Sequence, residues 1–202
     1  MTIAPDGRSL AGDVVRLDRF VADDIESLYA AIADERVYAG GFGGGPAALP
    51  ADVDQMRTQW IGATTQRTAY VVRLAGDSEL GAAGTVVGTT SLGDVDLANE
   101  SVHLGWTGYA PAVWGTAVNP ACKYLVLRHA FEDCGFERVK IQTGHVNTRS
   151  QAAIAKLGAT REGVLRHHKK QADGSWRDTV VFSILADEWP DVSKRLLDRI
   201  NR

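Results

Sequence analysis

The chain has 202 residues, of which 45% are hydrophobic and 23% are charged, and its formal net charge is −3. This composition favours one soluble domain over residues 1–202 and argues against a protein that wraps nucleic acid. No apolar run approaches the roughly 20 residues of a membrane span, and the N-terminus lacks a signal-peptide core. The two cysteines indicate reduced thiols, so we expect a cytoplasmic enzyme or binding domain.

The predicted elements alternate between strands and helices, with no internal repeat. In chain order they are a strand at 14–17, a helix at 22–33, a glycine-rich loop at 39–50, a helix at 52–61, strands at 69–74, 86–91 and 102–107, a helix from Asn119, a strand at 139–143, a helix at 150–157, a hairpin of 163–166 with 176–185, and a helix over about 188–201. The turn-rich links between the three central strands favour antiparallel neighbours. The pattern is α+β.

The stretch PAVWGTAVNPACKYLVL, from Pro111 to Leu127, is a turn that leads into a helix. Asn119 is a favoured N-cap, and Pro120 then takes the first helical position. A helix N-terminus presents unpaired N–H groups and about half a positive charge, which together suit an anion. The glycine patterns of triphosphate and dinucleotide loops do not occur in this stretch.

Residues Ser101 to Ala159 resemble the core of the GNAT superfamily of acyl-CoA N-acetyltransferases, and within it the RimJ/RimL group of ribosomal-protein N-terminal acetyltransferases. The resemblance is carried by the strand HLGWT, the turn after it, and an Asn-x-x-Ser element at Asn147 to Ser150 that follows the next strand. It extends over most of the chain. It implies a mixed, mostly antiparallel twisted sheet flanked by helices, acetyl-CoA as co-substrate, a primary amine as acceptor, and no metal.

In this family the strand HLGWT runs beside the pantetheine arm, and the turn after it wraps the pyrophosphate. The coenzyme-binding positions that the resemblance implies are Leu104, Gly105, Trp106, Trp114, Gly115, Thr116, Ala117, Val118, Asn119, Lys123, Asn147 and Arg149. Ala117 replaces a usual glycine, which costs roughly 1–2 kcal/mol if its φ is positive and almost nothing otherwise. Lys123 either reaches a coenzyme phosphate or is solvated on an exposed helix face.

Direct attack of an amine on the thioester requires a donor for the oxyanion, a neutral amine and a proton for the leaving thiolate. The resemblance implies a bulged strand at Leu104–Trp106 as the oxyanion donor and Ser150 as the acid; the alternative for Ser150 is to cap the helix that it opens. His103 has an unperturbed pKa suited to a general base, and its alternative is a structural histidine beside the sheet. Glu100 and Asp178 are further candidate bases.

The acceptor is left open among a protein α-amine, a small aminoacyl, antibiotic or polyamine substrate, and a protein lysine. An α-amine is roughly a tenth neutral at pH 7, far more than a lysine, so the lack of a clear carboxylate base favours a terminal amine. A non-catalytic CoA-binding regulatory module is the alternative function, and a homodimer is allowed.

The loop 39–50 is either a lid over the acceptor pocket or a plain connection. The basic run 166–170 attracts an acidic acceptor, an RNA-rich partner or a CoA phosphate, or is solvated surface.

Overall fold

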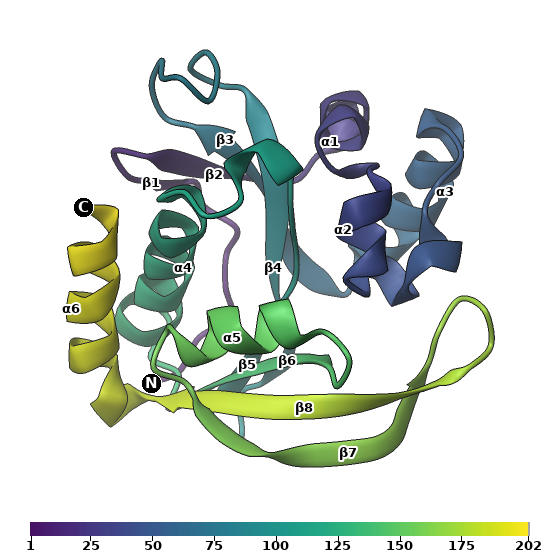
Figure 1. Ribbon diagram of the computed structural model, residues 1–202. Coiled ribbons are helices and arrows are strands. Elements are labelled where there is room, and N and C mark those ends of the chain that lie inside the picture. Colours follow the sequence, from purple (N-terminus) through teal and green to yellow (C-terminus); the bar gives the residue numbers. More distant parts are fainter. Residues whose placement is uncertain (202) are drawn as a thin grey trace.

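A single eight-stranded sheet forms the centre of the computed structural model, which describes residues 1–201 (Figure 1). Its strand order is β1-β2-β3-β4-β5-β6-β8-β7. The strands are β1 (Leu10–Ala11), β2 (Val15–Arg19), β3 (Arg67–Leu74), β4 (Val86–Asp96), β5 (Ser101–Tyr109), β6 (Arg138–Gly144), β7 (Thr160–Lys170) and β8 (Trp176–Leu185). β5 and β6 are parallel and the other neighbours are antiparallel, so the mixed, mostly antiparallel sheet is confirmed.

Helices cover both faces of this sheet. They are α1 (Ile25–Ile32), α2 (Glu35–Ala39), α3 (Val53–Ala63), α4 (Val118–Arg128), α5 (Thr148–Ala155) and α6 (Trp189–Ile200). Successive residues of β3 point to opposite faces, so Tyr70 and Val72 join the core under α4 and α6, whereas Val71 joins the smaller core under α1 and α3. The sheet therefore separates an α4/α6 face from an α1/α3 face (Figure 1).

Most predicted elements are present, with different limits. The predicted helix at 22–33 is a 3-10 turn at Ala22–Asp24 followed by α1. In the predicted hairpin, β7 is longer than the expected 163–166, whereas β8 has the predicted limits of 176–185. The sequence analysis missed α2, whose cap is Asp34: its carboxylate accepts a hydrogen bond from the amide of Arg36 at 2.8 Å. The loop at 39–50 contains two 3-10 turns, over 42–44 and 46–48.

The predicted N-terminus of the helix after the turn is wrong by two residues. α4 begins at Val118, so Asn119 lies inside the helix and Pro120 is at its third position rather than its first. The hydroxyl of Thr116 accepts a hydrogen bond from the amide of Val118 at 3.3 Å, which satisfies one of the first-turn amides that have no partner within the helix. Proline remains compatible with this place because the first-turn amides have no partner within the helix.

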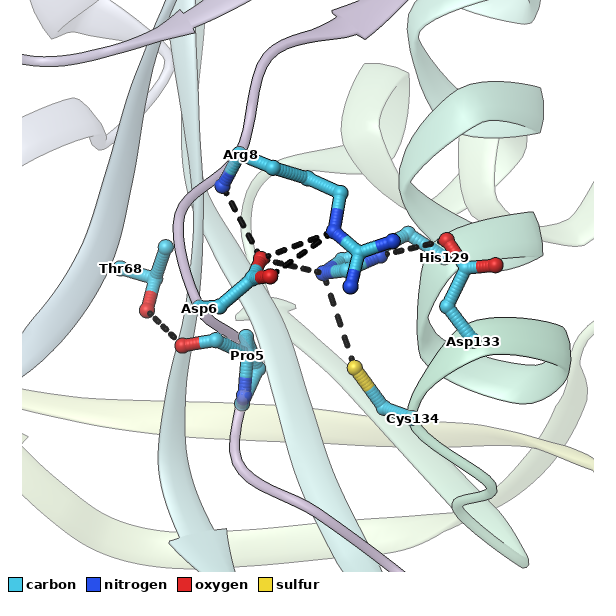
Figure 2. A network of polar contacts seen from close by, with 7 residues as sticks. All are labelled: Pro5, Asp6, Arg8, Thr68, His129, Asp133 and Cys134. Atoms are coloured by element: carbon cyan, nitrogen blue, oxygen red, sulfur yellow. Dashed lines mark hydrogen bonds and ion pairs between the residues drawn. The ribbon is translucent and has the colours of Figure 1, made fainter.

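The segment before β1 is fixed to the end of α4 by polar contacts (Figure 2). Asp6 pairs with Arg8 at 2.8 Å, and its carboxylate lies 4.0 Å from Nε2 of the buried His129. Nδ1 of His129 lies 2.8 Å from Asp133, and the sulfur of Cys134 lies 3.6 Å from Nε2. Burial raises the pKa of Cys134 to about 11, so this thiol is protonated at neutral pH.

Candidate active site

The two halves of the sheet separate between β5 and β6. These strands pair only from Ser101–His103 to Arg138–Lys140, although β5 continues to Tyr109 and β6 to Gly144. A cavity of about 850 Å³ lies where they part, and it is lined by residues of both strands, α5, the glycine-rich segment and the β7–β8 hairpin. This volume lies within the range of small-molecule and cofactor sites.

β5 is irregular at the point where it borders the cavity. Its pairing with β4 shifts between Gly105 and Gly108, so that β5 contains one extra residue there. Trp106 lies in this bulge with a φ of +49°, which is rare for a residue with a side chain. The family resemblance implied such a bulge in this strand, and the structure contains it. A bulge leaves a backbone amide outside the ladder, which is what an oxyanion donor requires.

His103 lies at the inner end of the parting strands, next to the bulge. It is only 3% exposed, its Nδ1 lies 3.1 Å from Oδ2 of Asp94, and its Nε2 has no hydrogen-bond partner within residues 1–201. Burial, reinforced by the charge of Lys140 and opposed by Asp94, lowers the pKa of His103 to about 4. The ring is therefore neutral at physiological pH. Because a carboxylate only accepts hydrogen bonds, Nδ1 carries the proton and Nε2 carries a free lone pair.

Asp94 is a candidate site residue that the sequence analysis missed. The predicted strand ends at residue 91, but β4 continues to Asp96 and has an extra residue between the pairs Gly93–His103 and Asp96–Ser101. The φ of Asp94 is +47° in this bulge, and its carboxylate meets His103. No local signal in the sequence marks Asp94, because the register between β4 and β5 decides which residue faces His103.

The other two candidate bases lie outside the cavity lining. Glu100 accepts a hydrogen bond from the hydroxyl of Thr2 at 2.8 Å, at the opposite end of β5. Asp178 accepts one from the amide of His167 at 2.8 Å, in the β7–β8 hairpin, rather than pairing with an arginine. Neither carboxylate is placed to receive a proton in the cavity.

The turn before α4 resolves the question of Ala117. Its φ is −68°, so the methyl group in place of the family's glycine introduces no strain. Gly115, with a φ of +82°, is the residue of this turn that needs the freedom of glycine. The amides of Gly115 and Ala117 donate to no atom of residues 1–201. They are free to bind an anion at the N-terminus of α4.

Lys123 is buried rather than solvated, so that alternative is wrong. The residue is 7% exposed, and its amine donates hydrogen bonds to the hydroxyls of Thr107 at 2.7 Å and Thr90 at 3.3 Å. Burial lowers its pKa to about 8. The side chain crosses from α4 to the strands that border the cavity and belongs to the cavity lining.

Ser150 does not cap α5. The side chain of Asn147 does so, because its Oδ1 accepts a hydrogen bond from the amide of Ser150 at 2.9 Å. α5 accordingly begins at Thr148, two residues before its predicted start. The Ser150 hydroxyl makes no side-chain hydrogen bond within residues 1–201 and lies on the cavity lining, where it is available to a ligand.

Asn147 and Arg149 connect the walls of the cavity. The amide group of Asn147 donates a hydrogen bond to the carbonyl of Gly40, at the start of the glycine-rich segment. The guanidinium of Arg149 stacks over the ring of Trp114, 3.7 Å from its centroid. The residues that the resemblance assigned to the coenzyme thus come together from β5, the turn and α5.

Nine of the twelve predicted coenzyme positions line the cavity, together with both predicted catalytic residues. Thr116, Ala117 and Val118 are the three that do not, and the side chain of Val118 is fully buried in the core. These three positions can contact a ligand only from the outer side of the turn, through the backbone or the Thr116 hydroxyl. The coenzyme assignments themselves stay predictions.

Within residues 1–201, no group of three or more His, Cys, Asp or Glu side chains is arranged to hold a metal ion. Over the same residues, no helix has both the length and the apolar character needed to cross a bilayer.

Comparison with protein families agrees with this geometry. Residues 15–160 match the model described as "Acetyltransferase (GNAT) domain". The chain belongs to the GNAT acetyltransferase family. The match runs from the start of β2 to the first residue of β7, and so includes the bulged strand, the turn and α5.

Individual relatives of this GNAT protein agree with the family assignment. A crystal structure from T. thermophilus assigned as an acetyltransferase has 32% identity and a TM-score of 0.82, covering 99% of this chain and all of that one. Mycobacterium smegmatis RimJ in complex with CoA-disulfide has the same fold, with 24% identity and a TM-score of 0.73 over 95% of this chain and 91% of that one. YdaF of Bacillus subtilis (strain 168), assigned as a ribosomal N-acetyltransferase, is 28% identical over 106 residues, 52% of this chain and 57% of that protein. The match to YdaF therefore spans little more than half of its length, and its name supports the RimJ/RimL-type resemblance.

Proposed function

We propose that this protein transfers the acetyl group of acetyl-CoA to a primary amine, by direct attack on the thioester. The observation that carries the proposal is the meeting of the Trp106 bulge, the unpartnered Nε2 of His103 and the hydroxyl of Ser150 on one cavity. The free amides of the turn at the N-terminus of α4 suit the pyrophosphate of the coenzyme.

The residues have distinct roles in this proposal. A backbone amide of the β5 bulge stabilises the oxyanion that forms when the amine nitrogen attacks the carbonyl carbon. The attached nitrogen then loses a proton to Nε2 of His103, and Asp94 stabilises the resulting imidazolium through Nδ1. As the carbon–sulfur bond breaks, the Ser150 hydroxyl protonates the coenzyme thiolate, and exchange with solvent then returns a proton to Ser150 and removes the one held by His103. The amine must arrive neutral, because a histidine with a pKa of about 4 does not deprotonate a free ammonium ion efficiently.

We favour a protein N-terminal α-amine or a small aminoacyl-type amine as the acceptor. Both have a larger neutral fraction at pH 7 than a lysine side chain has. The name of YdaF and the RimJ/RimL-type resemblance support a ribosomal protein as the polypeptide acceptor. The two cysteines are free and buried, which fits a cytoplasmic protein acting beside the ribosome.

The experiment is transfer of labelled acetyl groups from acetyl-CoA to a panel of amines, with coenzyme binding measured separately by calorimetry. We expect saturable binding and label on at least one amine. Binding without transfer to any amine would favour the non-catalytic CoA-binding module. No binding at millimolar coenzyme would remove the proposal altogether.

Ser150→Ala tests the assignment of the acid. The variant should lower turnover by far more than it changes the dissociation constant of the coenzyme, because the capping function belongs to Asn147. Thr148→Ala, at an exposed neighbouring position on the same helix, is the matched control. Equal rates for Ser150→Ala and the parent protein would exclude Ser150 from the mechanism.

A further inference from the structure

The cavity lining is strongly one-sided in charge. Among residues 1–201, it contains no aspartate or glutamate, but it contains six cationic side chains: Arg67, Lys123, Arg149, Lys169, Lys170 and Arg177. Lys123 and Arg149 lie by α4 and the turn, where the coenzyme phosphates are expected. The other four come from β3, β7 and β8, and the coenzyme-binding turn does not explain them.

Strand alternation assigns two of these four to the face opposite α4. On β3, Tyr70 and Val72 point to the α4/α6 core, so Arg67 points to the α1/α3 face. On β8, Val180 and Phe182 belong to that same α4/α6 core, so Arg177 also points to the α1/α3 face. His103 shares this face, because its neighbours Val102 and Leu104 are in the α4/α6 core. Both arginines therefore lie on the side of the sheet from which an acceptor meets Nε2 of His103.

Arg67 has aromatic neighbours but no anionic partner among residues 1–201. Its guanidinium stacks between two indole rings, 4.8 Å from the centroid of Trp106 and 5.9 Å from that of Trp60. Its Nε is buried without a hydrogen-bond partner in residues 1–201, and burial lowers its pKa to about 10. Trp106 also lies against His103, with ring centroids 4.7 Å apart, so Arg67 is one side chain away from the candidate base.

Arg177, on the far side of the cavity, is also partly buried without a carboxylate partner in residues 1–201. One of its terminal nitrogens donates to the hydroxyl of Thr179 at 3.1 Å, and its Nε is buried without a partner in the described chain. Lys169 lies opposite Arg177 in the register of β7 and β8. Burial lowers the pKa of His168, the positive charges of Lys169, Arg177 and Lys140 add to this, and Asp94 opposes it.

Arg67 and Arg177 are both partly buried, and the Nε of each has lost its water without gaining a partner in residues 1–201, which is costly for a cation with no carboxylate beside it. Two of them in one cavity indicate that a ligand supplies the missing anion. We infer that the acceptor carries a carboxylate close to its amine, and that Arg67 and Arg177 bind that carboxylate while the amine meets His103. Guanidinium groups suit carboxylates because they can donate two parallel hydrogen bonds. The inference rests on the proposed amine acetylation, and it excludes polyamines and other cationic acceptors.

The carboxylate has two candidate sources, an acidic side chain near a peptide N-terminus or the carboxylate of a free amino acid. The first experiment therefore compares kcat/KM, corrected for the neutral fraction of each amine, in two matched pairs. The peptide Ser-Asp-Glu-Gly-amide is compared with Ser-Asn-Gln-Gly-amide, and serine is compared with serinamide. We expect the carboxylate member of at least one pair to be favoured by about 30-fold or more, and that pair identifies the source. Equal values within both pairs would overturn the inference and leave the proposed function intact.

The second experiment assigns the preference to the two arginines. Arg67→Gln and Arg177→Gln should each lose most of the preference for the carboxylate acceptor, with little change for the amide acceptor or for the KM of acetyl-CoA. Arg161→Gln, at an exposed position on β7 outside the cavity lining, is the control. Equal losses for both acceptors in the arginine variants would overturn the inference.

Calorimetry with the N-acetylated acidic peptide, which is the reaction product, gives a readout independent of turnover, and saturable binding of acetyl-CoA by the same sample shows that the variant is folded. Binding that weakens in Arg67→Gln but not in Arg161→Gln would support the inference even for an enzyme with slow chemistry. If no amine accepts label, the result would instead count against the proposed function. The inference depends on that function and would then fail as well.

Discussion

His103 has one ring nitrogen with a strong partner and one with none. Asp94 holds Nδ1, whereas Nε2 is buried beside Gly105 without a hydrogen bond in the described residues. A side chain at position 105 would remove this space, since its Cβ would lie 2.6 Å from Nε2. A buried unsatisfied nitrogen costs roughly 1–3 kcal/mol, and an amine that donates to it would recover that cost.

The first prediction concerns this nitrogen. His103→Ala should lower the single-turnover rate of acetyl transfer by about 10²- to 10⁴-fold, the usual contribution of a positioned base. The dissociation constant of acetyl-CoA should change little. Asp94→Asn should cause a smaller loss, because Nε2 remains in place while the imidazolium loses its stabilising charge. His145→Ala, an exposed histidine on the loop before α5, is the control. A full rate in His103→Ala would mean that the acceptor amine needs no base.

Lys123 gives the second prediction. Its amine is buried with two threonine hydroxyls and no carboxylate, and its pKa of about 8 lies below the usual lysine value of 10.5. The unfolded chain therefore binds this proton more tightly, so the contribution of Lys123 to folding stability improves as the pH rises from 8 to 10.5 and is least favourable at pH 7. Lys123→Met should raise stability at pH 7 by up to roughly 3 kcal/mol.

Denaturant unfolding of parent and Lys123→Met at several pH values measures this difference. The two curves should converge toward pH 10, because the parent lysine is then neutral in the folded state. The same variant tests the coenzyme assignment, since it should bind acetyl-CoA more weakly if the amine serves a phosphate. A variant that is less stable than the parent at pH 7 would contradict the interpretation of Lys123 as an uncompensated buried cation.

At the scale of elements, the turn before α4 contains a matched pair for the third prediction. Gly115 has a φ of +82° with open space around it, and Ala117 has a φ of −68°. Gly115→Ala should strain the turn by roughly 1–2 kcal/mol and weaken coenzyme binding. Ala117→Gly, which restores the family's usual residue, should not tighten binding and should cost up to roughly 1 kcal/mol of stability. Isothermal titration and thermal melts measure both effects, and tighter binding by Ala117→Gly would contradict the conformation of this turn.

Sequence reasoning predicted the helices and strands better than it predicted the helix ends and the strand bulges. The antiparallel run β3-β4-β5 and the C-terminal helix followed from hydrophobic period and turn residues, and the bulge of β5 followed from the family resemblance. The limits of α4 were wrong because its N-cap is Ala117, which makes no side-chain capping bond and so leaves no signal in the sequence. The limits of α5 were wrong because Asn147 rather than Ser150 provides the cap, and both residue types are plausible caps. The extra residue in β4 that turns Asp94 toward His103 has no local sequence signal, since register depends on the neighbouring strand.

At the scale of the whole molecule, the sequence could not predict which cationic side chains meet on the α1/α3 side of the cavity. Arg67 and Arg177 are 110 positions apart, and nothing local distinguishes them from solvated arginines. The basic run 166–170 was noted as an attractor for an acidic acceptor, but of its residues only Lys169 and Lys170 line the cavity. The charge balance of a cavity is a property of the folded sheet, in which β3 and β8 approach the same opening from opposite sides.

The fourth prediction concerns the backbone of β5 beyond His103. With no neighbouring strand on the β6 side from Leu104 to Tyr109, the amides that face the cavity should exchange with solvent faster than those of β3. Acetyl-CoA should slow this exchange if its pantetheine amides take the place of the missing strand. Hydrogen exchange measured by mass spectrometry, with and without coenzyme, tests this. Unchanged exchange in β5 at saturating coenzyme would contradict binding along this strand.

The short contact between β5 and β6 also bears on how long the protein persists in a cell. In residues 1–201, the strand ladder between the two halves of the sheet consists of three residue pairs, from Ser101–His103 to Arg138–Lys140. A bound coenzyme would bridge the two halves of the sheet. Any ligand that binds only the folded state raises the apparent stability of that state as the ligand concentration rises. Protease resistance should then rise and fall with acetyl-CoA supply, so that the abundance of the enzyme would follow the metabolic state that feeds its own reaction.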